Sequence, residues 1–373
     1  MLIKALLTLI FSPIILALQI FGALDKPEVY TAPVEQPQVV KSEIADMATS
    51  SPDLTVPTMV ATTTSKQQVK PAVKTAPKTS ATTTPVAPEP QADFAAINTN
   101  ARKTLVNIFC TTKNNDLSPI SGTGVIIDNN GLILTNAHIG QYFLLKDFRE
   151  KDYLKCVGRT GSPAYPRYNL ELVYISPTWV AENKTILKDQ NPKGTGENDF
   201  AFLRITGNID SSSPSEYYSY IEPNMREIIN LWEPVLLASY PAGFLGGLSI
   251  IQDLNVTSSV TYIQDVFTFG DGSIDVISVG GTVVSQKGSS GGPVVDSKTS
   301  LIGIITTSSE GNTTSSRGLN AITVSYINRS IQKELDISFR QFLALDHAKF
   351  AQTFESTTRP NLTKLISDEL LRQ

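Results

Sequence analysis

Three polar residues at the edges of apolar segments have the side chains that nucleophilic catalysis needs. Ser290 lies in the stretch GSSGGP (288–293), whose glycines permit a tight turn and a close approach to a substrate. His138 follows the apolar run 132–134, and Asp199 precedes another apolar run. A serine hydroxyl is a poor nucleophile at neutral pH unless a neighbouring base accepts its proton. The three residues are therefore candidates for a nucleophile, a general base and an orienting acid.

Each of these residues has a plain structural explanation when it is taken alone. Glycine and serine runs most often mark loops, a single histidine is more often a satisfied structural side chain, and an Asn-Asp pair often forms a turn or a cap. These separate explanations do not account for the three residues together, because base, acid and nucleophile occur in the order His, Asp, Ser, each at the edge of a strand-like run. The order indicates a catalytic constellation.

The segments that must position these residues have the sequence pattern of an all-β domain. Apolar runs of strand length, separated by turn residues, recur from about residue 95, and Asn129-Asn130-Gly131 predicts a hairpin turn. Because long helices between the runs are missing, we expect two packed six-stranded antiparallel β-barrels rather than a parallel sheet. The predicted strands are 105–111, 124–128, 132–135, 170–175 and 200–205 in a first barrel (about 104–208), and 235–239, 250–258, 260–269, 274–279, 294–295 and 301–306 in a second (about 234–325).

Helical patterns occur in two places. Residues 142–151 are the one helix predicted inside the first half, and Ile327, Ile331 and Leu335 begin a helical spacing that continues to Leu345. We expect a C-terminal helix to close the domain, within a helical tail 331–373. His347 falls in this tail and is predicted to be a surface histidine.

The motifs TNAH (135–138), NDFAFL (198–203) and GSSGGPVV (288–295) make the sequence resemble the trypsin/chymotrypsin-like serine peptidases over about residues 95–330. Within that superfamily, GLILTNAH (131–138) and GSSGGPVV followed by LIGI (301–304) look closest to the bacterial Deg/HtrA-like branch. The resemblance implies a chymotrypsin-like fold and a serine endopeptidase that needs no metal or cofactor. It covers three motifs in order, whereas any one of them is a weak signal.

Carried over residue by residue, the resemblance makes Ser290 the nucleophile, His138 the base and then the acid, and Asp199 the orienting carboxylate. The backbone N–H groups of Gly288 and Ser290 would form the oxyanion hole, where the loss of one donor typically costs on the order of a hundredfold or more in rate.

The same pattern implies a substrate-binding region. Val284 would lie near the floor of the pocket for the side chain before the scissile bond, and Thr306, Thr307 and Ser308 would form a wall that pairs with the substrate backbone. No acidic residue is there to hold Lys or Arg. We therefore expect an uncharged, small or aliphatic substrate side chain, because an apolar floor would leave a cation unpaired.

Two departures from the family pattern are informative. Ser289 stands where trypsin-like members usually carry an aspartate that pairs with a newly cleaved N-terminus, and no Ile-Val-Gly-Gly-type start precedes Leu105. Activation by that ion pair is not expected. The sequence after Val324 is short for a PDZ domain, so the PDZ domain that many Deg/HtrA-like proteins carry is not expected either.

The composition excludes other classes of chemistry. The 373-residue chain has a formal net charge of -4 with scattered Lys and Arg, which argues against nucleic acid as a partner. Cys110 and Cys156 are the only cysteines, and no Cys/His spacing fits zinc. In an exported protein they would pair as a disulfide, which for a loop of this length stabilises by roughly 3 to 4 kcal/mol, and two unrelated buried thiols are the alternative.

The N-terminal residues 1–24 predict an export or membrane segment. Residues 5–24 are predominantly apolar after Lys4, and a helix of that length spans roughly 30 Å. The poor small-x-small pattern near residue 23 favours an uncleaved signal anchor over a removed signal peptide, with the chain after residue 24 outside the cytoplasm. Residues 25–94 are rich in Pro and Thr and predict a disordered, extended spacer that holds a domain away from the membrane.

Our leading hypothesis is a membrane-tethered, extracytoplasmic serine endopeptidase that cleaves polypeptides through an acyl-enzyme. The alternative is a catalytically inactive trypsin-like fold that acts as a peptide-binding or scaffold module in the cell envelope. The oligomeric state does not follow from the sequence.

Overall fold

The computed structural model describes residues 92–114, 117, 119–189, 194–243, 245–270, 272–308 and 318–372. These residues belong to one unit, Thr84–Gln373. The predicted signal segment lies outside the described residues, as does the predicted spacer up to residue 91. No helix in the described part of the chain combines the length and the hydropathy that crossing a bilayer requires.

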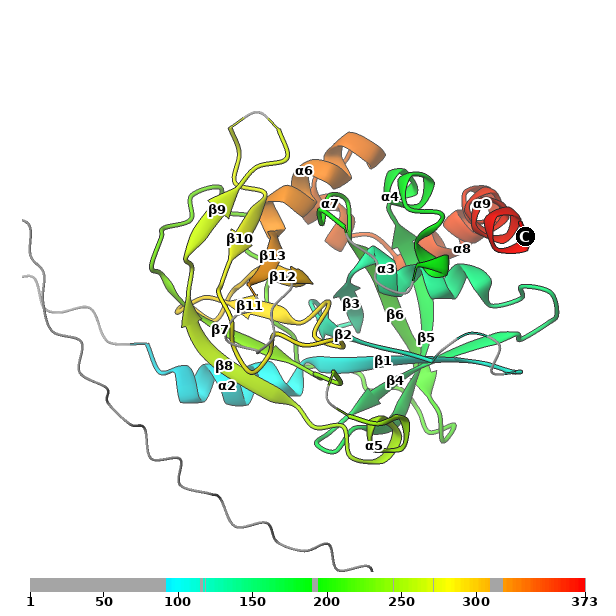
Figure 1. Ribbon diagram of the computed structural model, residues 1–373, viewed down its shortest axis with the longest axis horizontal. Coiled ribbons are helices and arrows are strands. Elements are labelled where there is room, and N and C mark those ends of the chain that lie inside the picture. Colours follow the sequence, from blue (N-terminus) through cyan, green and yellow to red (C-terminus); the bar gives the residue numbers. More distant parts are fainter. Residues whose placement is uncertain are drawn as a thin grey trace, which may run out of the picture. The chain divides into compact units, whose positions relative to one another are not determined.

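Six antiparallel strands close the first barrel in the order β1-β2-β3-β6-β5-β4 (Figure 1). Branched and aromatic side chains fill its interior, as their preference for a pleated, buried surface predicts. The predicted hairpin turn joins β2 to β3, and the Ile127 N–H donates to the Leu132 carbonyl at 2.8 Å across it. The strands are β1 (Leu105–Thr112), β2 (Ile120–Ile126), β3 (Leu132–Thr135), β4 (Leu154–Thr160), β5 (Tyr165–Ile175) and β6 (Ala201–Asn208).

The second half is a seven-stranded antiparallel sheet in the order β8-β7-β11-β12-β13-β10-β9. Its two edge strands are consecutive in the chain, because only Ile263 and Gln264 separate β8 from β9. The chain bends there from pairing with β7 to pairing with β10, so the sheet curls around its own core. The strands are β7 (Pro234–Ser239), β8 (Thr257–Tyr262), β9 (Asp265–Phe267), β10 (Val276–Ser278), β11 (Pro293–Val295), β12 (Leu301–Ser308) and β13 (Leu319–Thr323).

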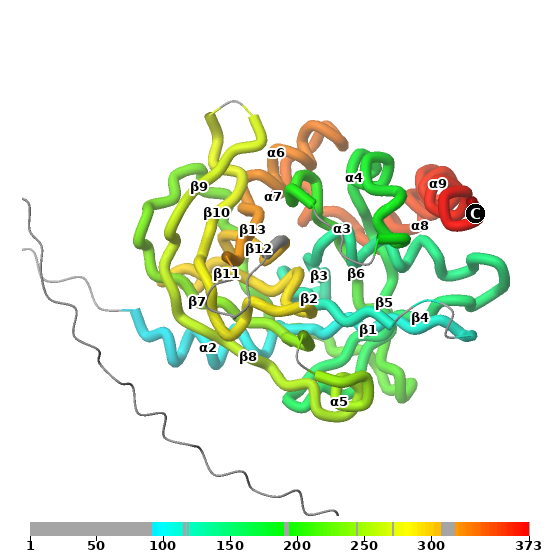
Figure 2. The backbone as a smooth tube through the Cα atoms, viewed as in Figure 1, coloured from blue at the N-terminus to red at the C-terminus, as the bar shows by residue number. Residues whose placement is uncertain are grey.

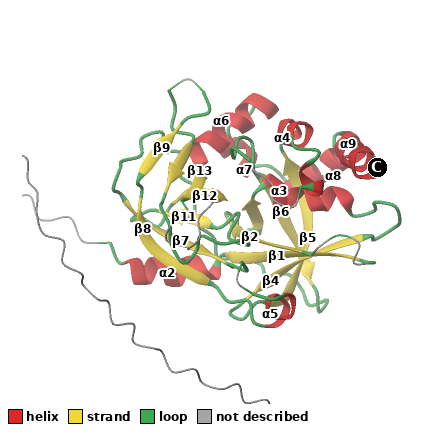
Figure 3. Cartoon of the chain, in the orientation of Figure 1, coloured by secondary structure: helices red, strands yellow, loops and turns green. Residues whose placement is uncertain are grey.

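The predicted chymotrypsin-like two-barrel fold is confirmed, with a difference of detail in the second barrel. The bend divides the predicted strand 260–269 between β8 and β9, and strand β13 was not predicted, so that seven strands occur where six were expected. Figure 3 shows the strands as two groups, with the helices around them.

Two predicted elements are wrong. Residues 250–258 were expected to be a strand, but helix α5 (Gly247–Gln252) occupies the start of this range and β8 begins at Thr257. The Arg159 guanidinium donates to the carbonyls of Ile250 and Ile251, which satisfies the end of that helix. The predicted helix 142–151 is only a 3₁₀ turn, η1 (Gln141–Leu145), and the chain enters the left-handed region at Arg149, within the predicted range.

Helices pack against both sheets. Helix α2 packs on β7, and α8 packs on β5; the tube in Figure 2 shows α8 and α9 together beside the first barrel. The helices not yet given are α2 (Phe94–Lys103), α3 (Ala137–Gly140), α4 (Pro177–Glu182), η2 (Ile186–Lys188), α6 (Val324–Leu335), α7 (Phe339–Leu343), α8 (His347–Thr357) and α9 (Arg359–Leu371).

The predicted C-terminal helix is divided into several. Asp336 adopts φ 58° and ends α6, and Ser338 begins α7 with a capping box that includes Gln341. The prediction of His347 as a surface residue is wrong: the side chain is buried at the start of α8, where its Nε2 lies 3.0 Å from the Phe342 carbonyl. The tail folds back onto the first barrel, which the helical spacing alone does not reveal.

Candidate active site

His138 and Asp199 leave their strands at the same edge of the first barrel. Strand β3 ends at Thr135, which pairs with Ala201 at the start of β6. The residues that follow β3 and precede β6 therefore emerge side by side. The His138 Nδ1 atom is 2.8 Å from Asp199 Oδ2, and the His138 backbone N–H donates to Asp199 Oδ1 at 2.9 Å. The carboxylate thereby holds the histidine at two points.

The environment of Asp199 favours its ionised form. Asp199 is 4% exposed, and burial by itself raises the pKa of its carboxyl. The charge of His138 and the hydrogen bonds from His138 and Thr306 outweigh burial, so the pKa of Asp199 lies below its ordinary value. The Thr306 hydroxyl donates to Asp199 Oδ2 at 2.6 Å. An ionised carboxylate only accepts hydrogen bonds, so His138 donates from Nδ1 and keeps Nε2 for proton transfer.

Helix α6 supports the turn that presents the acid. Asn198 adopts φ 54°, a left-handed conformation that asparagine tolerates better than most residues. Its backbone N–H donates to the Tyr326 hydroxyl at 2.9 Å, and that hydroxyl donates to Asn198 Oδ1 at 3.0 Å. Burial raises the pKa of Tyr326 to about 12, so the hydroxyl stays protonated. The sequence gives no signal for this contact, because the two residues are 128 positions apart.

The serine turn requires glycine at two positions. Gly288 has φ 93°, and a Cβ there would lie 2.6 Å from the Tyr240 carbonyl oxygen. Gly291 has φ 82°, and a Cβ would lie 2.0 Å from the Thr123 carbonyl oxygen. Both positions combine a positive φ with contact against backbone, which only glycine allows. The glycines predicted from the motif therefore have the conformational role expected of them.

Two backbone donors in the turn have no acceptor within the described residues: the N–H groups of Gly288 and Ser290. The neighbouring N–H groups are occupied, since Ser289 donates to the Gln286 carbonyl and Gly291 donates to the Ile305 carbonyl. Gly288 is buried and Ser290 is half-buried. Unpaired buried N–H groups are rare in folded proteins. Two of them flanking one residue are suited to stabilising an oxyanion.

The serine turn joins the other two residues through the strands behind it. Gly291 N–H bonds to the Ile305 carbonyl at 2.8 Å, and the next residue, Thr306, bonds to Asp199. Within the described residues no hydrogen bond connects the Ser290 hydroxyl to the His138 ring. Catalytic hydrogen bonds are often long before a substrate binds, so this geometry is compatible with a triad.

The residues predicted to bind substrate divide into three cases. Val284 is fully buried in the core of the second sheet, together with Ile305 and Leu319. The Thr306 hydroxyl is directed to Asp199, a role that the sequence did not indicate. The side chains of Thr307 and Ser308 lie outside the described residues, although their backbone continues β12.

The two cysteines lie opposite each other on neighbouring strands of the first barrel. Cys110 of β1 pairs in register with Cys156 of β4, and a disulfide joins their sulfur atoms. The structure thus contains the disulfide that an exported protein was expected to form. The alternative of two separate buried thiols does not apply to this pair.

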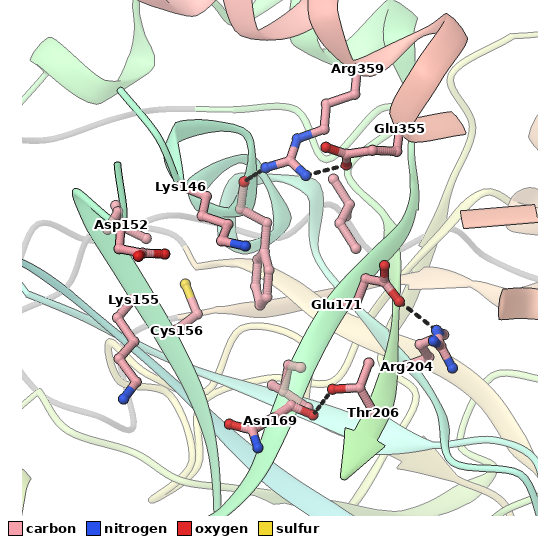
Figure 4. A pocket seen from close by; sticks show the side chains of 14 residues that line it. Lys146, Asp152, Lys155, Cys156, Asn169, Glu171, Arg204, Thr206, Glu355 and Arg359 are labelled. Atoms are coloured by element: carbon pink, nitrogen blue, oxygen red, sulfur yellow. Dashed lines mark hydrogen bonds and ion pairs between the residues drawn. The ribbon is translucent and has the colours of Figure 1, made fainter. Parts of the chain in front are cut away.

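A groove of about 840 Å³ lies on the first barrel, between its strands and helix α8, and no triad candidate lines it (Figure 4). Four of its charged side chains form two ion pairs: Arg204 bonds to Glu171 at 2.6 Å, and Arg359 bonds to Glu355. Ion pairs of this kind are typical of an exposed surface and contribute little. We therefore place the functional site at the serine turn.

Two β-barrels with a histidine-aspartate pair on one and a glycine-rich serine turn on the other define the chymotrypsin-like class of folds. Residues 122–304 match the family model described as Trypsin-like peptidase domain. This part of the chain is therefore a trypsin-like peptidase domain. No curated protein matches the chain.

Proposed function

We propose that this protein is a serine endopeptidase in which Ser290, His138 and Asp199 form the catalytic triad. The observation that carries the proposal is the two-point contact between Asp199 and His138, combined with the bonds that tie the serine turn to the strand bearing Thr306. These contacts support the proposal, because they connect His138, Asp199 and the turn that carries Ser290 although the three lie far apart in the sequence. We assign the oxyanion hole to the N–H groups of Gly288 and Ser290.

In the proposed reaction His138 Nε2 accepts the proton of Ser290 as the serine oxygen bonds to the peptide carbonyl carbon. The carbonyl electrons move onto oxygen, which receives hydrogen bonds from the Gly288 and Ser290 N–H groups. The carbon–nitrogen bond then breaks, and His138 returns its proton to the leaving amine. An acyl ester remains on Ser290.

Water completes the cycle through the same groups. His138 takes a proton from water as the water oxygen attacks the ester carbon, and the carbon–oxygen bond to Ser290 then breaks. The proton returns to the Ser290 oxygen, and the carboxylic acid product leaves. Asp199 stabilises the imidazolium in both halves of the reaction without taking its proton.

The proposal includes the setting of the enzyme. We place the peptidase outside the cytoplasm, tethered through residues 5–24, with a small or aliphatic residue before the scissile bond. Intact-mass measurement of the mature protein tests the tether: loss of the first 24 residues would indicate a secreted form. Digestion of a peptide library tests the substrate preference.

Labelling with a fluorophosphonate tests the triad. We expect the full-length protein to be modified on Ser290, because the reagent needs an activated serine and an oxyanion hole. Labelling is expected to disappear in Ser290→Ala and to fall by at least about a thousandfold in His138→Ala, as in other triad enzymes. If the wild-type protein is folded, with the same circular-dichroism spectrum as Ser290→Ala, and still never labels, the result would support the inactive peptide-binding module instead.

A further inference from the structure

Four consecutive carbonyl groups of the serine turn each accept a hydrogen bond from outside or across the turn. The Ala242 N–H donates to the Lys287 carbonyl at 2.7 Å, and the Gly292 N–H donates to the Ser289 carbonyl at 2.9 Å. In a trans peptide the N–H points opposite to the carbonyl of the preceding residue. Fixing the carbonyls of 287 and 289 therefore fixes the direction of the N–H groups of 288 and 290.

Thr123, on β2 of the first barrel, supplies the other two hydrogen bonds. Its hydroxyl donates to the Gly288 carbonyl at 2.7 Å, and its backbone N–H donates to the Ser290 carbonyl at 2.8 Å. The same hydroxyl accepts the Tyr240 N–H at 3.0 Å. Thr123 is fully buried, so water cannot replace these bonds without a rearrangement. One side chain thus joins the turn to both barrels.

A pair of buried serines secures the turn from the other side. The Ser239 hydroxyl at the end of β7 donates to the Ser289 hydroxyl at 2.9 Å, and both residues are at most 1% exposed. Ser289 occupies the position at which trypsin-like peptidases usually carry an aspartate, and a buried aspartate there would need a charged partner. A neutral pair avoids the cost of burying an unpaired charge. No ion pair or proteolytic cut is required to complete this contact.

We infer that Thr123, together with the Ser239–Ser289 pair, is a positioning device that keeps the oxyanion donors of Gly288 and Ser290 aimed at the substrate carbonyl before any substrate binds. The inference rests on the proposed peptidase function. Thr123 does not touch the substrate; it holds the peptide planes 288–289 and 290–291. These two planes lie on either side of the plane that carries the Ser290 N–H, and the first of them adjoins the plane that carries the Gly288 N–H. A misplacement of about 1 Å at such donors can cost on the order of a hundredfold in rate.

The test compares the second-order rate of fluorophosphonate labelling in full-length variants. Thr123→Val keeps the shape and removes the hydroxyl, and we expect the rate to fall by about tenfold to a hundredfold. Thr123→Ser restores the hydroxyl and is expected to stay within about threefold of wild type. Thr104→Val is the matched control, because Thr104 is equally buried and its hydroxyl bonds only to the Ala101 carbonyl, away from the turn.

A pH profile separates positioning from general damage. The His138–Asp199 contacts do not involve Thr123, so Thr123→Val should lower the plateau of the labelling rate and leave the midpoint of the profile unchanged. In a Ser290→Ala background, adding Thr123→Val should not change the affinity for a peptide identified by library digestion, since ground-state binding does not use the oxyanion hole. A shifted midpoint or a weakened affinity would overturn the inference.

The serine pair provides a second route if Thr123→Val does not fold. Ser239→Ala and Ser289→Ala each remove the same hydrogen bond, so each should slow labelling by about tenfold and the double variant should be no slower than either one. Wild-type rates in all folded variants would refute the positioning role while leaving the peptidase proposal intact. Absence of labelling in the wild type would refute the peptidase proposal and, with it, the inference.

Discussion

Asp199 is a buried charge whose partners reach it from separate segments of the chain. Burying a carboxylate is costly unless donors compensate for the lost water. His138 provides two donors and Thr306 provides a third. A buried acid that is stabilised in its charged form remains an acceptor throughout a reaction in which the histidine gains and loses a proton.

The lowered pKa of Asp199 predicts a pH-dependent contribution to stability. This contribution is present above the pKa of an unfolded aspartate, about 4, and is lost as the pH falls through the lower folded value. We expect Asp199→Asn to reduce the free energy of unfolding most at about pH 7 and to differ less from wild type at about pH 3. Urea unfolding at both pH values measures the difference. A difference that is constant or grows towards low pH would contradict the assigned contacts.

The residues that support the site are harder to predict than the residues that form it. The motifs predict His138, Asp199 and Ser290 as the candidate triad, because these side chains are chemically distinctive at their spacings. Thr123 and Thr306 are ordinary threonines of β-strands, and their hydroxyls act on groups 165 and 107 positions away. No local pattern encodes such a contact, since it exists only after the barrels have packed.

Among the elements, prediction succeeds where local signals agree and fails where a tertiary contact decides. Strand β3 has the bounds predicted for it, because turn residues border a short apolar run on both sides. The apolar residues of α5 look like a strand, but Arg159 of β4 binds the carbonyls at the end of this segment in its helical form. The buried guanidinium that decides the matter lies about ninety residues earlier in the chain.

Helix α6 contributes to the site through Tyr326, which gives an element-level prediction. Tyr326→Phe removes both hydrogen bonds to Asn198, so the turn before Asp199 loses its support. We expect the fluorophosphonate labelling rate to fall by several-fold and the stability to fall by about 1–3 kcal/mol, the usual range for a lost buried hydrogen bond.

Tyr174→Phe is the control for this experiment. Tyr174 is also buried, and its hydroxyl bonds to Glu334 on the same helix. It should lose comparable stability while it labels at the wild-type rate. Equal slowing in both variants would assign the effect to helix docking in general rather than to Tyr326.

At the scale of the whole molecule, the C-terminal helices are part of the core of the first barrel. The ring centroid of Phe342 lies 4.7 Å from the ring centroid of Phe202 on β6, and the ring centroid of Phe339 lies 5.6 Å from it. Aromatic pairs at these separations add to the free energy gained by burial. The helical spacing predicted the helices, but only the packed structure reveals that they cover the barrel.

This packing predicts a large effect of a single truncation. Phe342 is fully buried, so Phe342→Ala should lower the free energy of unfolding by about 3–5 kcal/mol through lost burial and a residual cavity. Phe267→Ala on β9 is the comparison, because Phe267 is 48% exposed and should cost far less. Denaturant titration measures both. Similar losses at the two positions would show that the tail is not integral to the core.

The two-barrel architecture was predictable from the number and spacing of strands, but the way in which the second sheet curls was not. The curl depends on the bend at Ile263 and Gln264, where one run of β-forming residues pairs first with β7 and then with β10. A sequence pattern reports that a segment is extended and does not report which neighbour it pairs with.

Each barrel donates a hydrogen bond from a threonine hydroxyl to a residue of the other barrel. Thr123 of the first barrel secures the turn that carries Ser290, and Thr306 of the second secures the acid that orients His138. Each half therefore completes the machinery of the other, and neither half contains a finished site. Under the proposed function, a chain with only one folded half would not hydrolyse peptides, so hydrolysis would report that the entire domain has assembled.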